Sequence, residues 1–253
     1  MDRDPSTAQS YDFSLGYIVR WLFDVAVLRR RRRLGPDSRA MLRGAQPRPR
    51  VVGIEHMPRE GACIVVMNHY ERPGLRVWWC AALVGAALEA HRGGEPPVHW
   101  LITDRFERFR YFGVPMPDRL MAWLLGKIGG AYGLLLVAKP DDEVRSRSSL
   151  LREAREILRA GAVLGITPEA ASGSGPELAA AWPGSGAAVS WLSSGTTPLV
   201  PVAVRDDEDG AMVATFGAPF TLERMSDEEG ARAVMGPIAA LLPPELRGVY
   251  GEE

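Results

Sequence analysis

Short apolar runs alternate with longer amphipathic stretches from residue 51 to the end of the chain. The short runs are rich in Val, Ile and Leu and predict buried strands at residues 62–67, 98–102, 134–138, 162–166, 199–204 and 212–216. The longer stretches predict helices at residues 73–91, 119–128, 145–159, 186–193 and 228–242. Strands separated by helices predict an α/β fold, with a mixed and largely parallel sheet flanked by helices.

A further amphipathic helix is predicted at residues 14–28. Its apolar positions fall at helical spacing: Leu15, Ile18, Trp21, Leu22, Val25 and Leu28. Arg20 and Asp24 are four residues apart and can pair on one face of this helix. Five arginines follow at 29–33, and an apolar stripe that ends in a basic cluster is typical of a helix in an anionic lipid interface. A helix packed on the protein core, with solvated arginines at its end, is the other interpretation.

The N-terminal segment is expected to be separate from the α/β domain. Three prolines predict that residues 35–50 form a linker. This divides the chain into a basic, membrane-associating segment with its linker at residues 1–50 and an α/β domain at residues 51–253. No uncharged apolar run reaches the roughly eighteen residues of a spanning helix. We therefore expect a peripheral or monotopic protein at the cytoplasmic face of a membrane.

Composition narrows the classes of partner and chemistry. The 253-residue chain is 46% hydrophobic and 24% charged, which excludes a disordered tail and a coiled coil. Eleven arginines and five aspartates give residues 1–50 a net charge of +6, which leaves −7 for the rest and favours a polyanionic partner such as a membrane surface. Nucleic acid is not expected, because no aromatic-interleaved strand accompanies the arginines. Two cysteines exclude a disulfide scaffold and a four-cysteine zinc site, and no metal or cofactor is expected.

Two loops at strand ends carry the candidate chemistry. Residues 68–74 and residues 167–173 each follow a predicted strand. Because α/β sheets bind ligands beyond the carboxyl ends of their strands, we expect both loops to lie at a binding site. His69 in the first loop is a candidate general base, since imidazole exchanges protons near neutral pH. A structural role for this histidine, and a capping role for Glu169 in the second loop, are the alternatives.

Four motifs follow one another over about residues 51–220. A short glycine-containing lead and a strand end in Asn68-His69, and a later strand leads into Thr-Pro-Glu at residues 167–169. Pro-Gly and a helix of small residues begin at residue 183, and residues 198–202 read Pro-Leu-Val-Pro-Val. In this order and with these gaps, the chain resembles the phospholipid/glycerol acyltransferase superfamily, its 1-acylglycerol-3-phosphate acyltransferase group.

The resemblance implies an acyltransferase of lipid metabolism with a glycerol-3-phosphate acyltransferase-like fold. The donor would be a thioester, acyl-CoA or acyl carrier protein, which acts as co-substrate, and the acceptor would be a lipid hydroxyl. His69 would deprotonate that hydroxyl, and no metal is needed. The resemblance places the substrate contacts at Asn68, Arg72, Lys139, Pro168, Glu169 and Ser172.

The chain departs from the family pattern at the partner of the histidine. The family's first motif is His-x-x-x-x-Asp, and the aspartate position counted from His69 is Gly74. Loss of the carboxylate that orients a catalytic histidine lowers turnover by roughly ten-thousand-fold in serine proteases. Glu71 is the nearest substitute and is assigned as a catalytic residue if the loop folds back on His69. A solvated glutamate at a helix start is the alternative, and Asp104 or another distant carboxylate is a further candidate partner.

A second departure concerns the phosphate of the acceptor. The family's Phe-Pro-Glu-Gly-Thr-Arg-Ser has its arginine where this chain has Ser172, and a family arginine after a middle strand is replaced by Lys139. Lysine lacks the bidentate fork of arginine that suits phosphate. We therefore expect an acceptor other than lysophosphatidic acid. Two further hypotheses remain: a catalytically inactive homologue that binds lipid or a partner protein, and a hydrolase in which His69 activates water.

Overall fold

The computed structural model describes residues 15–94, 97–103, 110–111, 114–115, 117–137, 147–169 and 175–251. Within these residues, seven strands form one sheet in the order β1-β9-β8-β2-β7-β3-β6. Its strands are β1 (Arg50–Val52), β2 (Cys63–Met67), β3 (Val98–Thr103), β6 (Leu135–Val137), β7 (Val163–Ile166), β8 (Leu199–Asp206) and β9 (Met212–Phe216). Every neighbouring pair is parallel except β8 and β9, which are antiparallel. The predicted mixed, largely parallel α/β sheet is confirmed.

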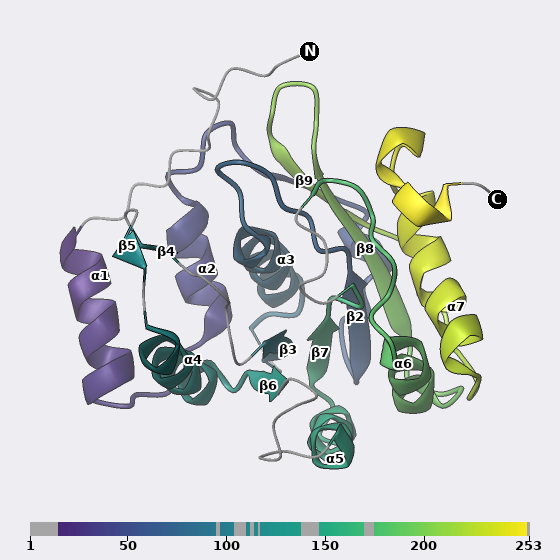
Figure 1. The fold of residues 1–253 in the computed structure, drawn as a ribbon, viewed down its shortest axis with the longest axis horizontal. Helices are drawn as coiled ribbons and strands as arrows, with labels where there is room; N and C mark the ends of the chain where they lie inside the picture. The colour runs from purple at the N-terminus through teal and green to yellow at the C-terminus, as the bar shows by residue number, and fades with distance from the viewer. Residues whose placement is uncertain are drawn as a thin grey trace.

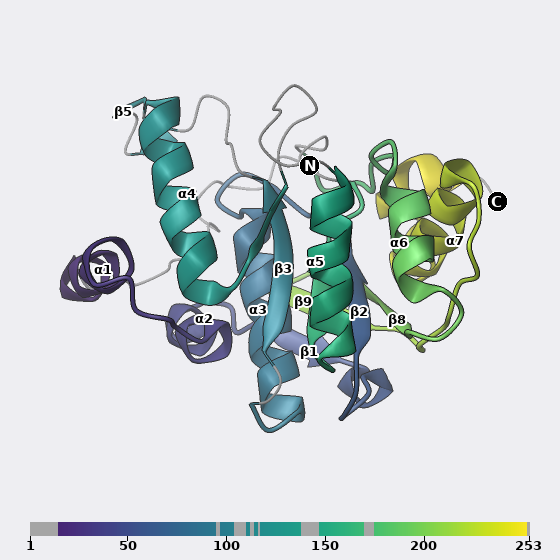
Figure 2. The same ribbon diagram turned by 90° about the horizontal axis from the view of Figure 1, so that it is seen from below.

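Helices cover both faces of this sheet (Figures 1 and 2). They are α1 (Leu15–Leu22), α2 (Leu34–Leu42), α3 (Val77–His91), α4 (Asp118–Tyr132), α5 (Arg147–Arg159), α6 (Ser185–Ser193) and α7 (Asp227–Ala240). Short additional elements are η2 (Phe23–Val27), η3 (Ile54–His56), β4 (Arg110–Tyr111), β5 (Val114–Pro115), η4 (Pro244–Leu246) and η5 (Gly248–Tyr250). The β4–β5 pair was not predicted, because two-residue strands leave no hydrophobic period to detect.

The central strand β2 is buried along its whole length. Cys63 and Val65 pack with α3 on one face, whereas Ile64 and Val66 pack with α5, α6 and α7 on the other. A strand covered on both faces has a continuous apolar run instead of alternation, which is why the sequence pattern located it. Burial on both sides also makes β2 a rigid base for the loop that follows it.

The predicted helix at residues 73–91 begins four residues later than expected. α3 starts at Val77, and Arg72 and Leu75 exchange both of their backbone hydrogen bonds across a tight turn. Pro73 followed by Gly74 at φ 82° has the sequence and glycine conformation of a type II turn. The turn, which needs a glycine with positive φ, takes the place of the first helical turn.

The predicted linker at residues 35–50 is wrong over its first half. Residues 34–42 form α2, which packs on α3 through Leu34, Met41 and Leu42. Pro36 lies in the first turn of this helix, where a missing N–H breaks no intrahelical hydrogen bond. The prolines suggested a linker, but Pro36 lies at the start of a helix. The division of the chain at residue 50 stays a prediction.

The N-terminal helix is present, but its polar contacts differ from those expected. α1 continues into the π-helical turn η2, whose hydrogen bonds span one residue more than those of an α-helix. Asp24 lies in this turn and is buried. Asp24 binds Arg32 at 2.7 Å and Arg30 at 3.6 Å, so the predicted pair with Arg20 is wrong. Arg32 also binds Asp37 at 2.7 Å.

The core-packed interpretation of this helix is confirmed for one of its faces, and the lipid-interface interpretation stays a prediction. Trp21 and Val25 pack on α4 through Ala131 and Tyr132, and the Trp21 Nε1–H donates to the Tyr132 hydroxyl at 2.7 Å. Leu22 and Leu28, from the same predicted stripe, are exposed. Part of the stripe is therefore core-packed, whereas Leu22 and Leu28 face outward.

Candidate active site

Parallel strands bring the two predicted loops to one edge of the sheet. β2, β7 and β8 run in the same direction and end at Met67, Ile166 and Asp206. His69 and Glu169 lie just beyond the ends of β2 and β7, and the backbone N–H of His69 donates to Glu169 Oε1 at 2.6 Å. His69 and Glu169 thus bring the two loops together, and the expectation that they lie at a binding site stays a prediction. We call this edge the carboxyl edge.

Glu169 joins two segments of the main chain. Its side chain is buried, and its second oxygen, Oε2, accepts the backbone N–H of Ala179 at 2.6 Å. Burial raises the pKa of Glu169 to about 7, and the N–H groups of His69 and Ala179, which favour the charged form, oppose that rise. The carboxylate thus fastens the loop after β2 to the segment after β7.

Asn68 is bound to the neighbouring strand. Its Nδ2 donates to the Val204 carbonyl at 2.9 Å, and its Oδ1 accepts the Val204 N–H at 2.7 Å. The side chain therefore continues the β2–β8 ladder one step past the last paired residues, Met67 and Val202. This geometry positions the start of the loop, and the predicted substrate contact of Asn68 stays a prediction.

Glu71 lies at the N-terminus of α3. Its Oε1 accepts the Val77 N–H at 3.3 Å, and its Oε2 lies 3.3 Å from Arg76 Nη1. A carboxylate at this position satisfies a helix N–H and complements the helix dipole. These contacts match the alternative of a glutamate at a helix start. The proposed orientation of His69 by Glu71 stays a prediction.

Arg72 forms an internal ion pair with Asp206, the last residue of β8. Tyr70 is buried beside this pair, and its pKa is raised first by burial and then by the Asp206 charge. Sequence reasoning missed Asp206. The available signal was its position, because a carboxylate at the end of a strand parallel to β2 must lie at the same edge as His69.

Lys139, Ser172 and the alternative carboxylate Asp104 lie outside the described residues. Pro168 is buried, and its carbonyl accepts the Trp182 N–H at 2.8 Å. The substrate contacts predicted for Lys139, Pro168 and Ser172 stay predictions, as does the pairing of Asp104 with His69.

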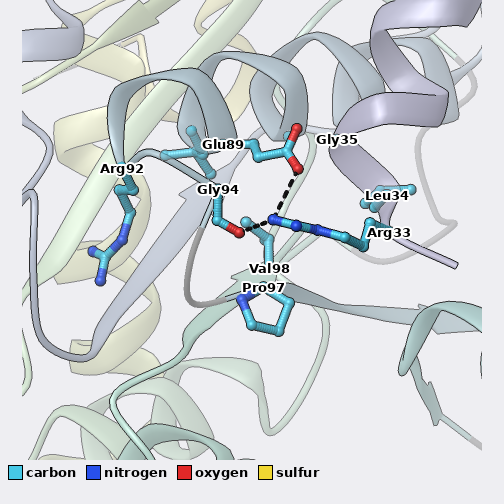
Figure 3. Close-up of a pocket in the computed structure, with 10 residues that line it drawn as sticks. Arg33, Leu34, Gly35, Glu89, Arg92, Gly94, Pro97 and Val98 are labelled. Atoms are coloured by element: carbon cyan, nitrogen blue, oxygen red, sulfur yellow. Dashed lines mark hydrogen bonds and ion pairs between the residues drawn. The ribbon is translucent and has the colours of Figure 1, made fainter. Parts of the chain in front are cut away.

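A small pocket lies at the opposite edge of the sheet. It is lined by residues from the start of α2, the end of α3 and the start of β3, among them Arg33, Glu89 and Val98. Figure 3 shows Arg33 reaching between Glu89 and the Gly94 carbonyl. The cavity of about 20 Å³ has room for roughly one water molecule. It is therefore a packing defect between helices and not a substrate site.

Among the described side chains, no group of three or more His, Cys, Asp and Glu residues is arranged to hold a metal ion. Cys63 and Cys80 are buried as free thiols, and burial raises the pKa of Cys63 to about 11. A thiol with a raised pKa is mostly protonated at neutral pH, so Cys63 is a poor nucleophile. His69 remains the candidate proton acceptor of the site.

The fold and the carboxyl edge define an α/β protein with a histidine beyond the end of its central strand. No protein-family model matches the chain, and no curated protein matches it. One solved structure to which it is similar is the 1-acyl-sn-glycerophosphate (LPA) acyltransferase PlsC from Thermotoga maritima, with a TM-score of 0.47 and 15% identity over 89% of this chain and 80% of that chain.

Proposed function

We propose that this protein is an acyltransferase of lipid metabolism, which moves an acyl group from a thioester donor to a lipid hydroxyl. The observation that supports it most is the bond between the His69 backbone and Glu169, which joins two loops of the sequence motifs at the carboxyl edge. The donor is acyl-CoA or acyl carrier protein. The departures at Ser172 and Lys139 favour an acceptor other than lysophosphatidic acid.

In the proposed reaction, His69 acts as the general base. Its imidazole takes the proton of the acceptor hydroxyl while the hydroxyl oxygen attacks the thioester carbonyl carbon. The tetrahedral oxyanion then collapses, the carbon–sulfur bond breaks, and the departing thiolate takes the proton back from the imidazolium. Proton transfer of this kind contributes about 10²–10⁴-fold to rate.

The test is acyl transfer from labelled acyl-CoA or acyl carrier protein to a panel of lipid acceptors. We expect the His69→Ala variant to lose about 10²–10⁴-fold in turnover. His99→Ala is the matched control, because this histidine lies near the start of β3 and its ring binds the Gly133 carbonyl at 2.6 Å. Equal turnover by wild type and His69→Ala would remove His69 from the mechanism. Release of free fatty acid without an acceptor would instead indicate a hydrolase.

One observation favours a second candidate, a catalytically inactive homologue that binds lipid or a partner protein. The position of the family aspartate is Gly74, which is exposed and has φ 82° in the turn after Arg72. A non-glycine residue is disfavoured in this conformation, so the turn favours glycine over the family aspartate at this position. Absence of transfer by the wild-type protein with every donor and acceptor, together with equal lipid binding by wild type and His69→Ala, would support this candidate.

We further propose that the protein binds an anionic membrane surface through the outer face of α1 and η2. Large apolar side chains are exposed along this face: Val19, Leu22, Phe23, Val27 and Leu28. Phe23 and Val27 are 52% and 61% exposed, although the helix already buries a second apolar face against α4. Arg29 and Arg31 are exposed at the end of this row. Apolar residues beside cations fit a lipid interface with negative headgroups. Among the residues described, no helix has the length and apolar character needed to cross a bilayer.

Vesicle flotation tests this surface with the full-length chain. We expect the Val19→Ser, Phe23→Ser, Val27→Ser triple variant to lose binding to vesicles of phosphatidylglycerol and phosphatidylcholine, and salt to weaken wild-type binding. Val249→Ser, which changes another highly exposed apolar residue, should bind normally. Because these side chains are exposed, the variants should fold. Wild-type binding by the triple variant would refute this surface.

A further inference from the structure

Glu169 is a buried carboxylate held between two main-chain segments. Only 1% of its surface is exposed, and each of its oxygens accepts a backbone N–H at 2.6 Å, one from His69 and one from Ala179. Among the described residues, the two segments also meet in a longer bond of 3.4 Å, from the Glu71 N–H to the Gly175 carbonyl. Hydrogen bonds to an ionised acceptor are short and strong, so Glu169 is the tighter connection between the loops.

We propose that Glu169 is a positioning residue, whose carboxylate fixes the main chain of His69 and so aims the imidazole at the acceptor hydroxyl. This inference rests on the proposed acyl transfer. It differs from the substrate contact that the family resemblance implies for Glu169, because the group bound here is the backbone of the proposed base. The side chain of a residue follows the direction set by its Cα, so a shift of the His69 backbone moves the ring with it.

Side-chain chemistry explains why a glutamate is needed. Both partners are N–H donors, so the bridging group must accept at both ends. Glutamine offers one oxygen and one NH₂, and therefore opposes a donor to one of the two N–H groups. Aspartate keeps both oxygens but is one methylene shorter. The Glu169→Gln variant thus keeps the size of the side chain and breaks one bond, whereas Glu169→Asp keeps the charge and changes the reach.

The first measurement is the pH titration of two backbone amide protons by NMR. We expect the Ala179 amide of the full-length protein to titrate with a midpoint near 7, set by Glu169. The residue-69 amide should titrate with the same midpoint when measured in His69→Ala, where no imidazole contributes. Both titrations should disappear in Glu169→Gln. Glu177→Gln, which changes an exposed glutamate nearby, should leave them unchanged.

The second measurement is the split between kcat and KM for acyl transfer. A misplaced base should lower kcat of Glu169→Gln by roughly 100-fold and change KM for the acceptor little, with partial rescue in Glu169→Asp. A raised KM with an unchanged kcat would overturn the proposal in favour of a substrate contact. A wild-type Ala179 amide that does not titrate would also overturn it, whether or not the variants fold. Titration without any wild-type transfer would refute the proposed function and leave the connection between the loops standing.

Discussion

The two edges of the sheet hold their polar side chains in different ways. At the carboxyl edge, Asn68 and Glu169 bind backbone groups of other segments, and Glu71 binds the Val77 N–H of the helix that follows it. One side-chain ion pair, Arg72 with Asp206, lies beside them. At the opposite edge, Arg33 and Arg39 bind Glu89, so side chains pair with each other between α2 and α3. The carboxyl edge therefore shapes loops, and the opposite edge joins two helices.

The contrast between the two edges indicates that function is expected at the carboxyl edge. A side chain that binds a backbone fixes the path of a loop, and a fixed loop presents its other side chains in a defined direction. An ion pair between partly exposed side chains contributes little to stability and sets no loop geometry. The pocket at the helix-joining edge does not alter this conclusion, because its volume of about 20 Å³ suits about one water molecule.

The largest predicted loss of stability follows from removing the Asn68 amide. Asn68→Ala leaves the buried N–H and carbonyl of Val204 without their side-chain partner. Each unsatisfied group costs about 1–3 kcal/mol, so the free energy of unfolding should fall by about 4 kcal/mol. Urea denaturation measures this change. A loss below about 1 kcal/mol would mean that backbone binding at this edge is as weak as an exposed ion pair.

The next largest effect is the pH dependence of stability caused by Glu169. Burial raises its pKa from 4.5 to about 7 in the folded protein. The folded state therefore retains a proton that the unfolded chain releases above pH 4.5. The resulting stabilisation is complete below pH 4.5 and is lost as the pH rises through 7, by up to ~3 kcal/mol.

Unfolding free energies of wild type and Glu169→Gln, measured between pH 4.5 and 8, isolate this contribution. The difference between the two proteins should change across that range, because glutamine does not titrate. A constant difference would show that the Glu169 pKa is not shifted by folding.

The smallest effect is expected at the other edge. Arg39→Ala removes a half-exposed guanidinium from Glu89, which keeps its contact with Arg33 at 3.3 Å. The loss of stability should be under about 1 kcal/mol and should shrink further in high salt. Urea denaturation at low and high salt checks both expectations. A larger or salt-independent loss would remove the distinction between the two edges.

The central part of the sheet was predictable because its strands are buried on both faces, whereas β1, which has exposed residues at both ends, was not predicted. β2, β7 and β8 contain continuous apolar runs, and helices of ordinary length separate them. α2 was missed because prolines are typical of linkers, although Pro36 in the first turn suits a helix start. The start of α3 was placed too early because a hydrophobic pattern does not reveal a Pro-Gly turn that precedes a helix.

The site was predictable to the level of the two loops. His69 and Glu169 each follow a strand, and parallel strands end at one edge, so their proximity followed from topology. The partners of these side chains were not predictable, because Ala179 and Val204 contribute backbone atoms that have no residue-type signature. The pair of Arg72 with Asp206 joins residues 134 positions apart, and only the fold reveals it.

The central claim is that His69 acts as a base in acyl transfer. Single-turnover transfer from labelled acyl-CoA to the best lipid acceptor, compared between wild type and His69→Ala, tests it most directly. We predict a rate at least about 100-fold slower in the variant, with folding unchanged by circular dichroism. Equal rates in the two proteins would contradict it.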